Sequence, residues 1–325
     1  MTASVEAPEA TPPEGSANAP LARRLQDNLA RAIRGKPEEL RLLCVAFLAG
    51  GNVLLTDVPG VGKTTLAKAV ARSVQGTFRR VQFTPDLLPA DILGGSIYNP
   101  QGGTFTFRQG PIFCHVLLAD EINRASPRTQ SSLLEAMAEG QVSIEGVTHE
   151  LPRPFWVIAT QNPVEHHGTY PLPEAQLDRF AVQLAMGYPP EEEEIEVLGS
   201  LDERPPVDAL RPVATLEEVL ETQARVRRLP VHLDVRRYIV SLLGASRQEP
   251  RLALGVSPRG GILLYRLAQA HAFEQGRAAV LPDDVKAVAV PTLAHRVVLE
   301  TKARYSGVSK EQVIKDLLQR VPVPV

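Results

Sequence analysis

The sequence lacks the features that mark membrane-spanning, disulfide-bonded or strongly charged proteins. Only two of its 325 residues are cysteines, and because Cys44 and Cys114 both lie in apolar runs, we expect buried, reduced thiols rather than a disulfide or metal ligands. The longest uncharged stretch, residues 42–56, is shorter than the roughly 20 apolar residues that span a bilayer. The net charge is only −2. We therefore expect neither membrane insertion nor a nucleic-acid partner attracted by a general excess of charge.

The amino-terminal segment lacks a secretory signal, which needs a basic start followed by an apolar core. Residues 1–20 are instead rich in Pro, Ala and Glu and show no hydrophobic periodicity, so they are predicted to form a disordered tail. A cytoplasmic location is expected. The hydrophobic and charged fractions, 44% and 22%, are those of a globular chain whose length favours two domains.

The first half of the chain, residues 21–188, has the alternating pattern of an α/β domain. Five short apolar runs separated by helical patterns predict a five-stranded parallel sheet flanked by helices. These runs are residues 52–56, 80–83, 115–119, 155–159 and 181–184. Two β-hairpin insertions are predicted, one over residues 95–108 and one over residues 141–151, because alternating residues flank Gly102-Gly103 and Glu145-Gly146.

The second half, residues 189–325, is predicted to be an α-helical domain. Pro189 and Pro190 stop the α/β pattern, and no strand-like alternation follows them. Helix starts are expected near residues 191, 215, 234, 257, 282 and 309. At the second of these, Thr215 and Glu218 have the spacing of a capping box.

A phosphate-binding loop is predicted between the first strand and the next helix, in the run Asp57-Val-Pro-Gly-Val-Gly-Lys-Thr-Thr65. Glycines let backbone amides face a phosphate chain, a lysine offsets its charge, and a threonine hydroxyl binds Mg²⁺. The usual pattern opens with glycine, where this chain has Asp57. An ordinary glycine-rich turn is the alternative. The expected phosphate-binding residues are Pro59, Gly60, Val61, Gly62, Lys63, Thr64 and Thr65.

Two carboxylates, Asp120 and Glu121, end the third apolar run. Ligands gather at the carboxyl ends of parallel strands, so Asp120 is predicted to hold Mg²⁺ through water, beside the metal ligand Thr64. Glu121 is predicted to polarise a water for attack on the terminal phosphate, which favours hydrolysis over transfer to another substrate. The alternative is an acidic strand end that caps the following helix.

Two further residues are candidates for the same site. Asn162 follows the next apolar run, where its amide is placed to orient the attacking water or the γ-phosphate. Arg179 lies just before the last run. From the residues alone, an ion pair between Arg179 and Asp178 or another surface carboxylate is the simpler interpretation.

Five ordered motifs resemble the AAA+ ATPases and, within them, the MoxR family. They are Asp57-Val-Pro-Gly-Val-Gly-Lys-Thr, Ala119-Asp-Glu-Ile-Asn-Arg-Ala125, Ala159-Thr-Gln-Asn-Pro163, Gly168-Thr-Tyr-Pro-Leu-Pro-Glu-Ala-Gln-Leu-Asp-Arg-Phe180 and Gly255-Val-Ser-Pro-Arg-Gly260. Acidic residues also precede Val-Pro-Gly in this family, so Asp57 fits it. The resemblance spans nearly all of residues 21–325.

The resemblance implies a role for each matching residue. Lys63 and Thr64 correspond to Walker A, Asp120 and Glu121 to Walker B, Asn162 to sensor 1, Arg179 to an arginine finger and Arg259 to sensor 2. Arg259 would reach the phosphates when the helical domain closes as a lid. The two hairpins correspond to insertions that tend to face the pore or the client in ring ATPases.

The resemblance therefore implies an ATPase that uses ATP and Mg²⁺, forms a homo-oligomeric, hexameric ring and remodels or matures client proteins in a chaperone-like way, alongside proteins with von Willebrand factor A domains. Two alternatives stay open. One is a DNA-acting AAA+ motor or transcription activator, against which the net charge of −2 argues. The other is a nucleotide-gated binding scaffold with little turnover, against which Glu121 argues.

Overall fold

A computed structural model describes residues 20–58, 60–100, 103–162, 169–199 and 206–323. At its centre is a five-stranded parallel sheet with the strand order β2-β5-β8-β1-β9, which confirms the predicted α/β fold. The strands are β1 (Val53–Thr56), β2 (Phe78–Gln82), β5 (Val116–Asp120), β8 (Trp156–Gln161) and β9 (Val182–Leu184). Each overlaps one of the five apolar runs.

The sheet is apolar on both faces because its inner strands are apolar at consecutive positions. In β1, Val53 and Leu55 pack into one hydrophobic cluster, whereas Leu54 between them packs into a second cluster on the other face. The alternation of side chains along a strand produces this division. A strand with two buried faces needs helices on both sides.

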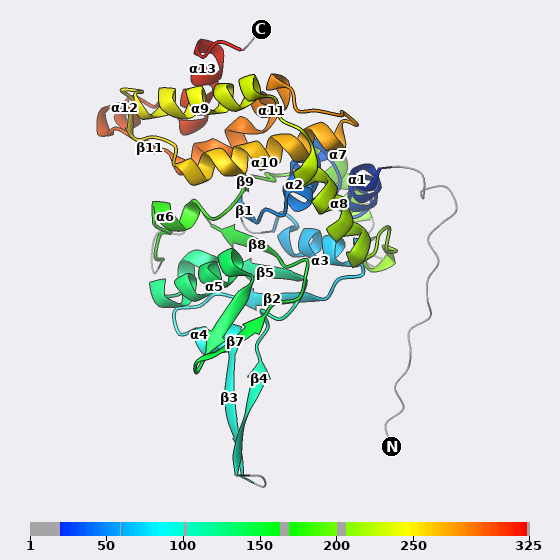
Figure 1. Cartoon of the computed structure of the whole chain (residues 1–325). Coiled ribbons are helices and arrows are strands. Elements are labelled where there is room, and N and C mark those ends of the chain that lie inside the picture. The colour runs from blue at the N-terminus through cyan, green and yellow to red at the C-terminus, as the bar shows by residue number, and fades with distance from the viewer. Residues whose placement is uncertain (1–19, 59, 101–102, 163–168, 200–205, 324–325) are drawn as a thin grey trace.

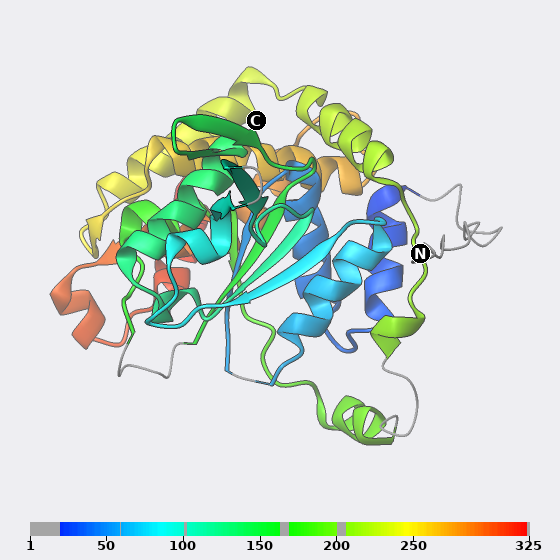
Figure 2. The ribbon, with the colours of Figure 1, turned by 90° about the horizontal axis from the view of Figure 1, so that it is seen from below.

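Helices cover both faces of the sheet (Figure 2). One face carries α1 (Leu21–Ala30), α2 (Pro37–Ala49) and α3 (Lys63–Ser73), and the other carries α4 (Pro89–Leu93) and α5 (Pro127–Glu139). A short helix, α6 (Glu174–Leu177), precedes β9. The helix α3 begins directly at the end of the predicted phosphate-binding loop, so it is the helix that positions this loop.

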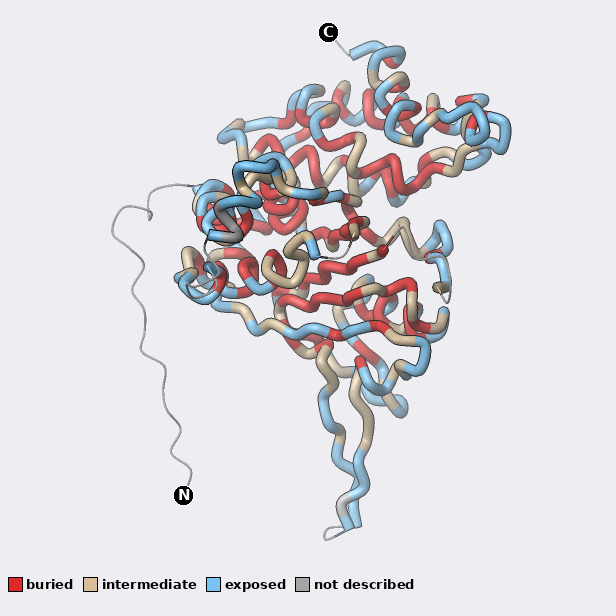
Figure 3. The backbone as a smooth tube through the Cα atoms, turned by 180° about the vertical axis from the view of Figure 1, so that it is seen from behind, coloured by how far each residue is buried: buried red, intermediate tan, exposed pale blue. Residues whose placement is uncertain are grey.

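Both predicted hairpins are present. The first consists of β3 (Gly94–Asn99) and β4 (Thr104–Gln109), and the second of β6 (Gln141–Ile144) and β7 (Val147–Glu150). The β3–β4 hairpin projects from the body of the molecule, and most of its length is exposed (Figures 1 and 3). Its base is fixed to the other hairpin, because the rings of Phe107 and His149 stack with their centroids 4.1 Å apart.

The second half is helical, as predicted. Its helices are α7 (Glu191–Gly199), α8 (Leu216–Arg228), α9 (Leu233–Arg247), α10 (Pro258–Glu274), α11 (Pro282–Leu293), α12 (Thr301–Tyr305) and α13 (Lys310–Arg320). The side chain of Thr215 accepts a hydrogen bond from the backbone N–H of Glu218, as the capping pattern predicts. A two-stranded antiparallel pair, β10 (Leu252–Leu254) and β11 (Val298–Leu299), was not predicted from the sequence because strands this short show no alternation.

The two halves share one hydrophobic cluster. Helices α8 and α10 pack against α2, and the side-chain amide of Gln223 donates a hydrogen bond to the carbonyl of Phe47 across the junction (2.8 Å). Cys44 lies in this cluster and Cys114 in the other, so both thiols are buried as predicted. Among the described residues, none of the helices is long and apolar enough to cross a bilayer.

Candidate nucleotide-binding site

The loop between β1 and α3 has the backbone geometry of an anion-binding turn. Gly60 and Gly62 have φ angles of +89° and +82°, a region that glycine enters without strain. Helix α3 begins at Lys63, so the first-turn amides and the positive end of the helix dipole are directed toward the loop. Pro59 was predicted to belong to the site but lies outside the described residues. The predicted residues Val61, Thr64 and Thr65 lie half-buried in the loop and the first helical turn.

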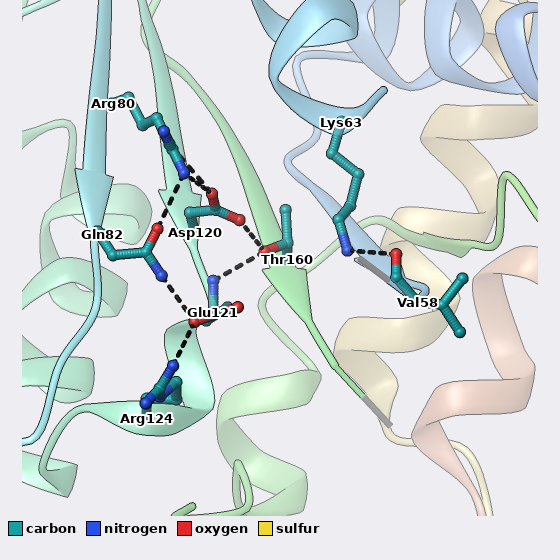
Figure 4. Close-up of polar contacts among 8 residues, drawn as sticks. All are labelled: Val58, Lys63, Arg80, Gln82, Asp120, Glu121, Arg124 and Thr160. Carbon is teal, nitrogen blue, oxygen red and sulfur yellow. Dashed lines mark hydrogen bonds and ion pairs between the residues drawn. The ribbon is translucent and has the colours of Figure 1, made fainter. Parts of the chain in front are cut away.

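The ammonium group of Lys63 lies over this loop. Its Nζ donates hydrogen bonds to the backbone carbonyls of Asp57 (3.0 Å) and Val58 (3.1 Å), as Figure 4 shows for the second of these. Because both acceptors are neutral carbonyls, the positive charge of Lys63 is not cancelled by these contacts. The loop therefore presents a cation beside the helix N-terminus, which suits a phosphate chain.

Asp57, the departure from the usual loop pattern, has a structural role. Its carboxylate is buried and accepts hydrogen bonds from the backbone N–H groups of Met186 and Gly187 (3.1 Å for Gly187). These residues directly follow β9, where the chain leaves the sheet toward the helical half. Asp57 thus fixes the start of the loop to the exit of the neighbouring strand, which a glycine has no side chain to do.

Asp120 ends β5 at the same edge of the sheet. Its Oδ1 accepts a hydrogen bond from the hydroxyl of Thr160 (2.6 Å), and its Oδ2 accepts hydrogen bonds from Arg80 Nε (3.1 Å) and Nη2 (2.7 Å), as seen in Figure 4. These contacts hold the carboxylate in one orientation. They also place a cation beside it, so a metal that interacts with Asp120 through water leaves the ion pair with Arg80 intact.

Glu121 follows Asp120 in a left-handed backbone conformation, with φ of +55°. Such a conformation is uncommon for glutamate and is found where the surrounding structure enforces it. The backbone N–H of Glu121 donates a hydrogen bond to Thr160 Oγ1 (2.8 Å). Its carboxylate Oε2 accepts hydrogen bonds from Gln82 (2.7 Å) and Arg124 (3.0 Å). Gln82 and Arg124 thus hold the second carboxylate, whereas Arg80 and Thr160 hold the first.

Asn162 completes the row of polar groups at this edge of the sheet. It follows β8, which pairs with β5 on one side and with β1 on the other. Its side chain is buried. The strand order thus brings the amide of Asn162 between the acidic pair after β5 and the phosphate-binding loop after β1, which is the arrangement expected from the sequence.

The residues at this edge fit a nucleotide with its magnesium ion. A Cβ atom added to Gly60 would have no other atom within 4 Å, so there is open space beside the loop for phosphate oxygens. Thr64 and Asp120 supply a hydroxyl and a carboxylate, the hard oxygen ligands that Mg²⁺ prefers, and Mg²⁺ typically keeps several waters and substrate oxygens as its other ligands. Two protein ligands are therefore sufficient for this metal.

A pocket lies next to the loop. A Cβ on Gly62 would lie 3.6 Å from Cδ1 of Ile33, which lines this pocket of about 500 Å³ between the α1–α2 connection and α7. Pro37 and Leu40 add apolar surface, and Glu193 brings a carboxylate to the rim. Arg34, Lys36 and Glu192 line it too, so its walls combine apolar and charged groups.

The two predicted arginines lie directly after α6 and in the first turn of α10. The guanidinium of Arg179 donates a hydrogen bond from Nη1 to the carbonyl of Leu134 in α5 (2.6 Å). Asp178 forms an ion pair with Arg296 (2.9 Å), so the described contact of Arg179 is with a backbone carbonyl and not with Asp178 or another surface carboxylate. Arg259 is exposed in the first turn of α10. Its proposed action on phosphates stays a prediction.

Several residues of the site were missed by the sequence reasoning. Thr160 bridges Asp120 and Glu121, and Arg80 and Gln82 contact one carboxylate each. A signal for the latter two exists, since residues two apart on a strand share a face and β2 lies beside the strand of the acidic pair. Ile33 carried no signal, because it is brought to the loop by tertiary packing alone.

The sheet order, the loop, the acidic pair and the helical half define a P-loop ATPase of the AAA+ class. Residues 52–182 match the family described as "ATPase family associated with various cellular activities (AAA)", and residues 244–317 match the AAA lid domain. A putative ATPase of Cytophaga hutchinsonii has the same fold, with a TM-score of 0.87 and 36% identity over 94% of this chain and 96% of that one.

Curated relatives narrow the class to a family. The chain is 42% identical to "Chaperone MoxR1" of Mycobacterium tuberculosis over 90% of this chain and 80% of that protein. It is 47% identical to "Uncharacterized protein YeaC" of Bacillus subtilis over 94% of this chain and 96% of that protein. A "Protein MoxR" of Methylorubrum extorquens is 31% identical over 92% of this chain and 93% of its own length. The chain belongs to the MoxR family of AAA+ ATPases.

The role of Asp57 predicts a specific loss of stability. Asp57→Ala removes the acceptor of two backbone N–H groups, so the free energy of unfolding should fall by roughly 3 to 6 kcal/mol, given about 1.5 to 3 kcal/mol for each hydrogen bond to a charged group. Urea denaturation measures this. Asp283→Ala, at a carboxylate whose side chain is 80% exposed, is the control and should cost under about 1 kcal/mol. Equal losses in both variants would contradict the assigned role.

Proposed function

We propose that the protein hydrolyses ATP to ADP and phosphate with Mg²⁺. The observation that carries this proposal is the presence of two adjacent carboxylates, Asp120 and Glu121, at the edge of the sheet that also bears the Lys63 loop. A kinase would need to exclude water and hold a second substrate. A second carboxylate beside the metal ligand instead suits the activation of water.

Each residue of the site has a part in this reaction. Lys63 and the first turn of α3 bind the phosphates, and the pocket beside Ile33 takes the base. When bound, Mg²⁺ would neutralise charge that develops on the phosphate oxygens, with the Thr64 hydroxyl as a ligand and Asp120 holding the ion through water. Glu121 accepts the proton of the attacking water after its carboxylate leaves Gln82 and Arg124. Asn162 orients that water or the γ-phosphate.

Arg179 acts on the ATP of a neighbouring subunit in this proposal. Its partner Leu134 packs in the hydrophobic cluster on the α5 face of the sheet, whereas α3 and its loop are on the opposite face. Figure 1 draws α5 and α6 on one side and α3 on the other. Arg179 is thus held on the α5 side of the sheet, whereas the proposed phosphate position is at the N-terminus of α3. A ring of subunits, with hexameric symmetry implied by the family resemblance, would bring each Arg179 to the next site.

We further propose that ATP turnover drives chaperone-like remodelling or maturation of client proteins. One relative bears the name "Chaperone MoxR1", and the family resemblance adds a protein with a von Willebrand factor A domain as a partner. The projecting β3–β4 hairpin supports a client contact. Its Tyr98 and Phe105 are 52% and 71% exposed, and their ring centroids lie 5.3 Å apart. Exposed apolar groups on a projecting element favour binding to another chain.

The assignment of Glu121 predicts that binding and chemistry can be separated. Glu121→Gln keeps the size and polarity of the side chain but removes the base, so ATP should still bind while hydrolysis falls by roughly 10²-fold or more. Lys63→Ala should instead weaken ATP binding, because it removes the cation beside the phosphates. Titration calorimetry and a steady-state phosphate-release assay measure the two effects. Hydrolysis by Glu121→Gln at the parental rate would show that another group is the base.

The trans action of Arg179 predicts complementation between two inactive proteins. Arg179→Ala should bind ATP normally and lose about 10³-fold in turnover, the lower end of the effect of an arginine finger. When it is mixed with Lys63→Ala, some interfaces combine an intact loop with an intact arginine. The ATPase activity of the mixture should therefore exceed the sum of the separate proteins. Mixed assemblies, detected with two different affinity tags, that recover nothing would contradict trans action.

The client role of the hairpin predicts a position-specific effect on substrate capture. A tagged Glu121→Gln protein loaded with ATP should retain client proteins, and adding Phe105→Ser should lower their yield several-fold. Tyr305→Ser in the same background is the control, because Tyr305 is 87% exposed on α12, away from the hairpin. Quantitative mass spectrometry of the eluates gives the yields. Equal capture by the two double variants would argue against the hairpin as the contact.

A further inference from the structure

The carboxylate of Asp178 joins the α/β half to the helical half. Its Oδ1 accepts a hydrogen bond from Arg296 Nε (2.9 Å) and its Oδ2 accepts one from the hydroxyl of Ser257 (2.8 Å). Ser257 is the N-cap of α10, where its oxygen also accepts a hydrogen bond from the N–H of Gly260 (3.0 Å). Arg296 ends the short 3₁₀ helix after α11. One side chain of the core thus contacts two separate elements of the helical half.

Arg296 holds the chain segment around Asp178 by its backbone as well. Its guanidinium also donates to the carbonyls of Asp178 (3.2 Å), Phe180 and Ala181 (3.4 Å), while its own side chain is only 1% exposed. Burial lowers the pKa of Arg296 to about 10, and the Asp178 carboxylate opposes this shift. A buried cation that loses its partner costs several kcal/mol, so these contacts are retained as a unit.

Arg179 lies within the segment, residues 178–181, that Arg296 contacts. Residues 178, 180 and 181 all contact Arg296, and the side chain of Arg179 is held on the other side by the carbonyl of Leu134. Its backbone position is therefore set by the helical half and its side-chain direction by α5. The exposed Arg259 belongs to the same junction, since it lies two residues after Ser257 in the first turn of α10.

We propose that Asp178 is a positioning residue that couples the location of Arg179 to the helical half of its own chain. The proposal rests on the proposed trans action of Arg179. Ala181 is tied to the sheet by a hydrogen bond from its N–H to the carbonyl of Asn52 (2.7 Å), so when the helical half moves, the Asp178–Arg296–Ser257 junction displaces Asp178 and Arg179 relative to that anchor. The conformation of one subunit then determines whether its arginine reaches the γ-phosphate bound to the next. A subunit can in this way pass its state to its neighbour without any change in its own Lys63 loop.

The test asks which of two inactive variants, Lys63→Ala or Arg179→Ala, restores ATPase activity when it is mixed with a variant of Asp178. Asp178→Asn keeps the volume of the side chain but removes the charge that Arg296 requires. ATP affinity should stay within about twofold, and turnover should fall roughly 10- to 100-fold, since a displacement of about 1 Å in a catalytic group can cost 10²-fold. Mixed with Lys63→Ala, whose junction is intact, Asp178→Asn should recover activity. Mixed with Arg179→Ala it should recover none, because neither protein then supplies a working arginine.

A subunit that is merely destabilised gives a different pattern. A destabilised subunit would complement neither partner. If Asp178→Asn instead complements Arg179→Ala, its own arginine still works. Either result overturns the proposal, and so does parental activity of Asp178→Asn alone. The mixture of Arg179→Ala with Lys63→Ala is run in parallel. If this mixture recovers no activity, the trans action of Arg179 is wrong, and the coupling through Asp178 is wrong with it. If it recovers activity, the mixtures that contain Asp178→Asn test the coupling alone.

A second variant guards against misfolding of Asp178→Asn. Ser257→Gly removes the hydroxyl that donates to Asp178, and glycine is well tolerated at a helix N-cap. Ser257→Gly should also recover activity with Lys63→Ala and not with Arg179→Ala, with a smaller loss of turnover on its own. Complementation of Arg179→Ala by Ser257→Gly, or a lack of complementation with both partners, contradicts the proposal. Circular dichroism and thermal unfolding confirm that each variant is folded before it is mixed.

Discussion

The parallel pairing of β5, β8 and β1 is the constraint on which the site depends. Because all three strands run in one direction, their carboxyl ends meet at one edge, and the acidic pair, Asn162 and the Lys63 loop follow from that register. A shift of one residue in any strand would turn the relevant side chain to the other face. Helices on both faces bury the sheet and keep this register fixed, so the stability of the core and the geometry of the site have the same origin.

The charged side chains at this edge of the sheet have hydrogen-bond or ion-pair partners that a bound nucleotide can replace. Asp120 is paired with Arg80, Glu121 is held by Gln82 and Arg124, and Lys63 rests on two neutral carbonyls. Each charged group has a partner that a nucleotide with Mg²⁺ can replace or supplement. Binding therefore reorganises existing contacts instead of burying new unpaired charges, which would carry a large desolvation cost.

Much of this arrangement could be predicted from the sequence, and the failures have physical reasons. The strands, both hairpins and the helix starts carry local signals: apolar runs, glycine turns and capping residues. The loop and the acidic pair carry motif signals, and their juxtaposition follows from the strand-end rule. Some contacts join residues far apart in sequence through tertiary packing, and no local pattern predicts them. Examples are Ile33 with Gly62 of the loop, Thr160 with Asp120, and Asp178 with Arg296, which are 29, 40 and 118 positions apart. The pair β10–β11 was missed because it is too short to alternate.

The central claim is that a complete catalytic site needs two subunits. The most direct test is the specific ATPase activity of the parental protein over a wide range of concentrations, with the fraction of assembled protein measured in the same solutions by analytical ultracentrifugation. With the proposed trans action of Arg179, specific activity should rise in proportion to the assembled fraction, because an isolated subunit would then have no arginine finger for its own site. Full specific activity in solutions that contain only monomer would contradict it.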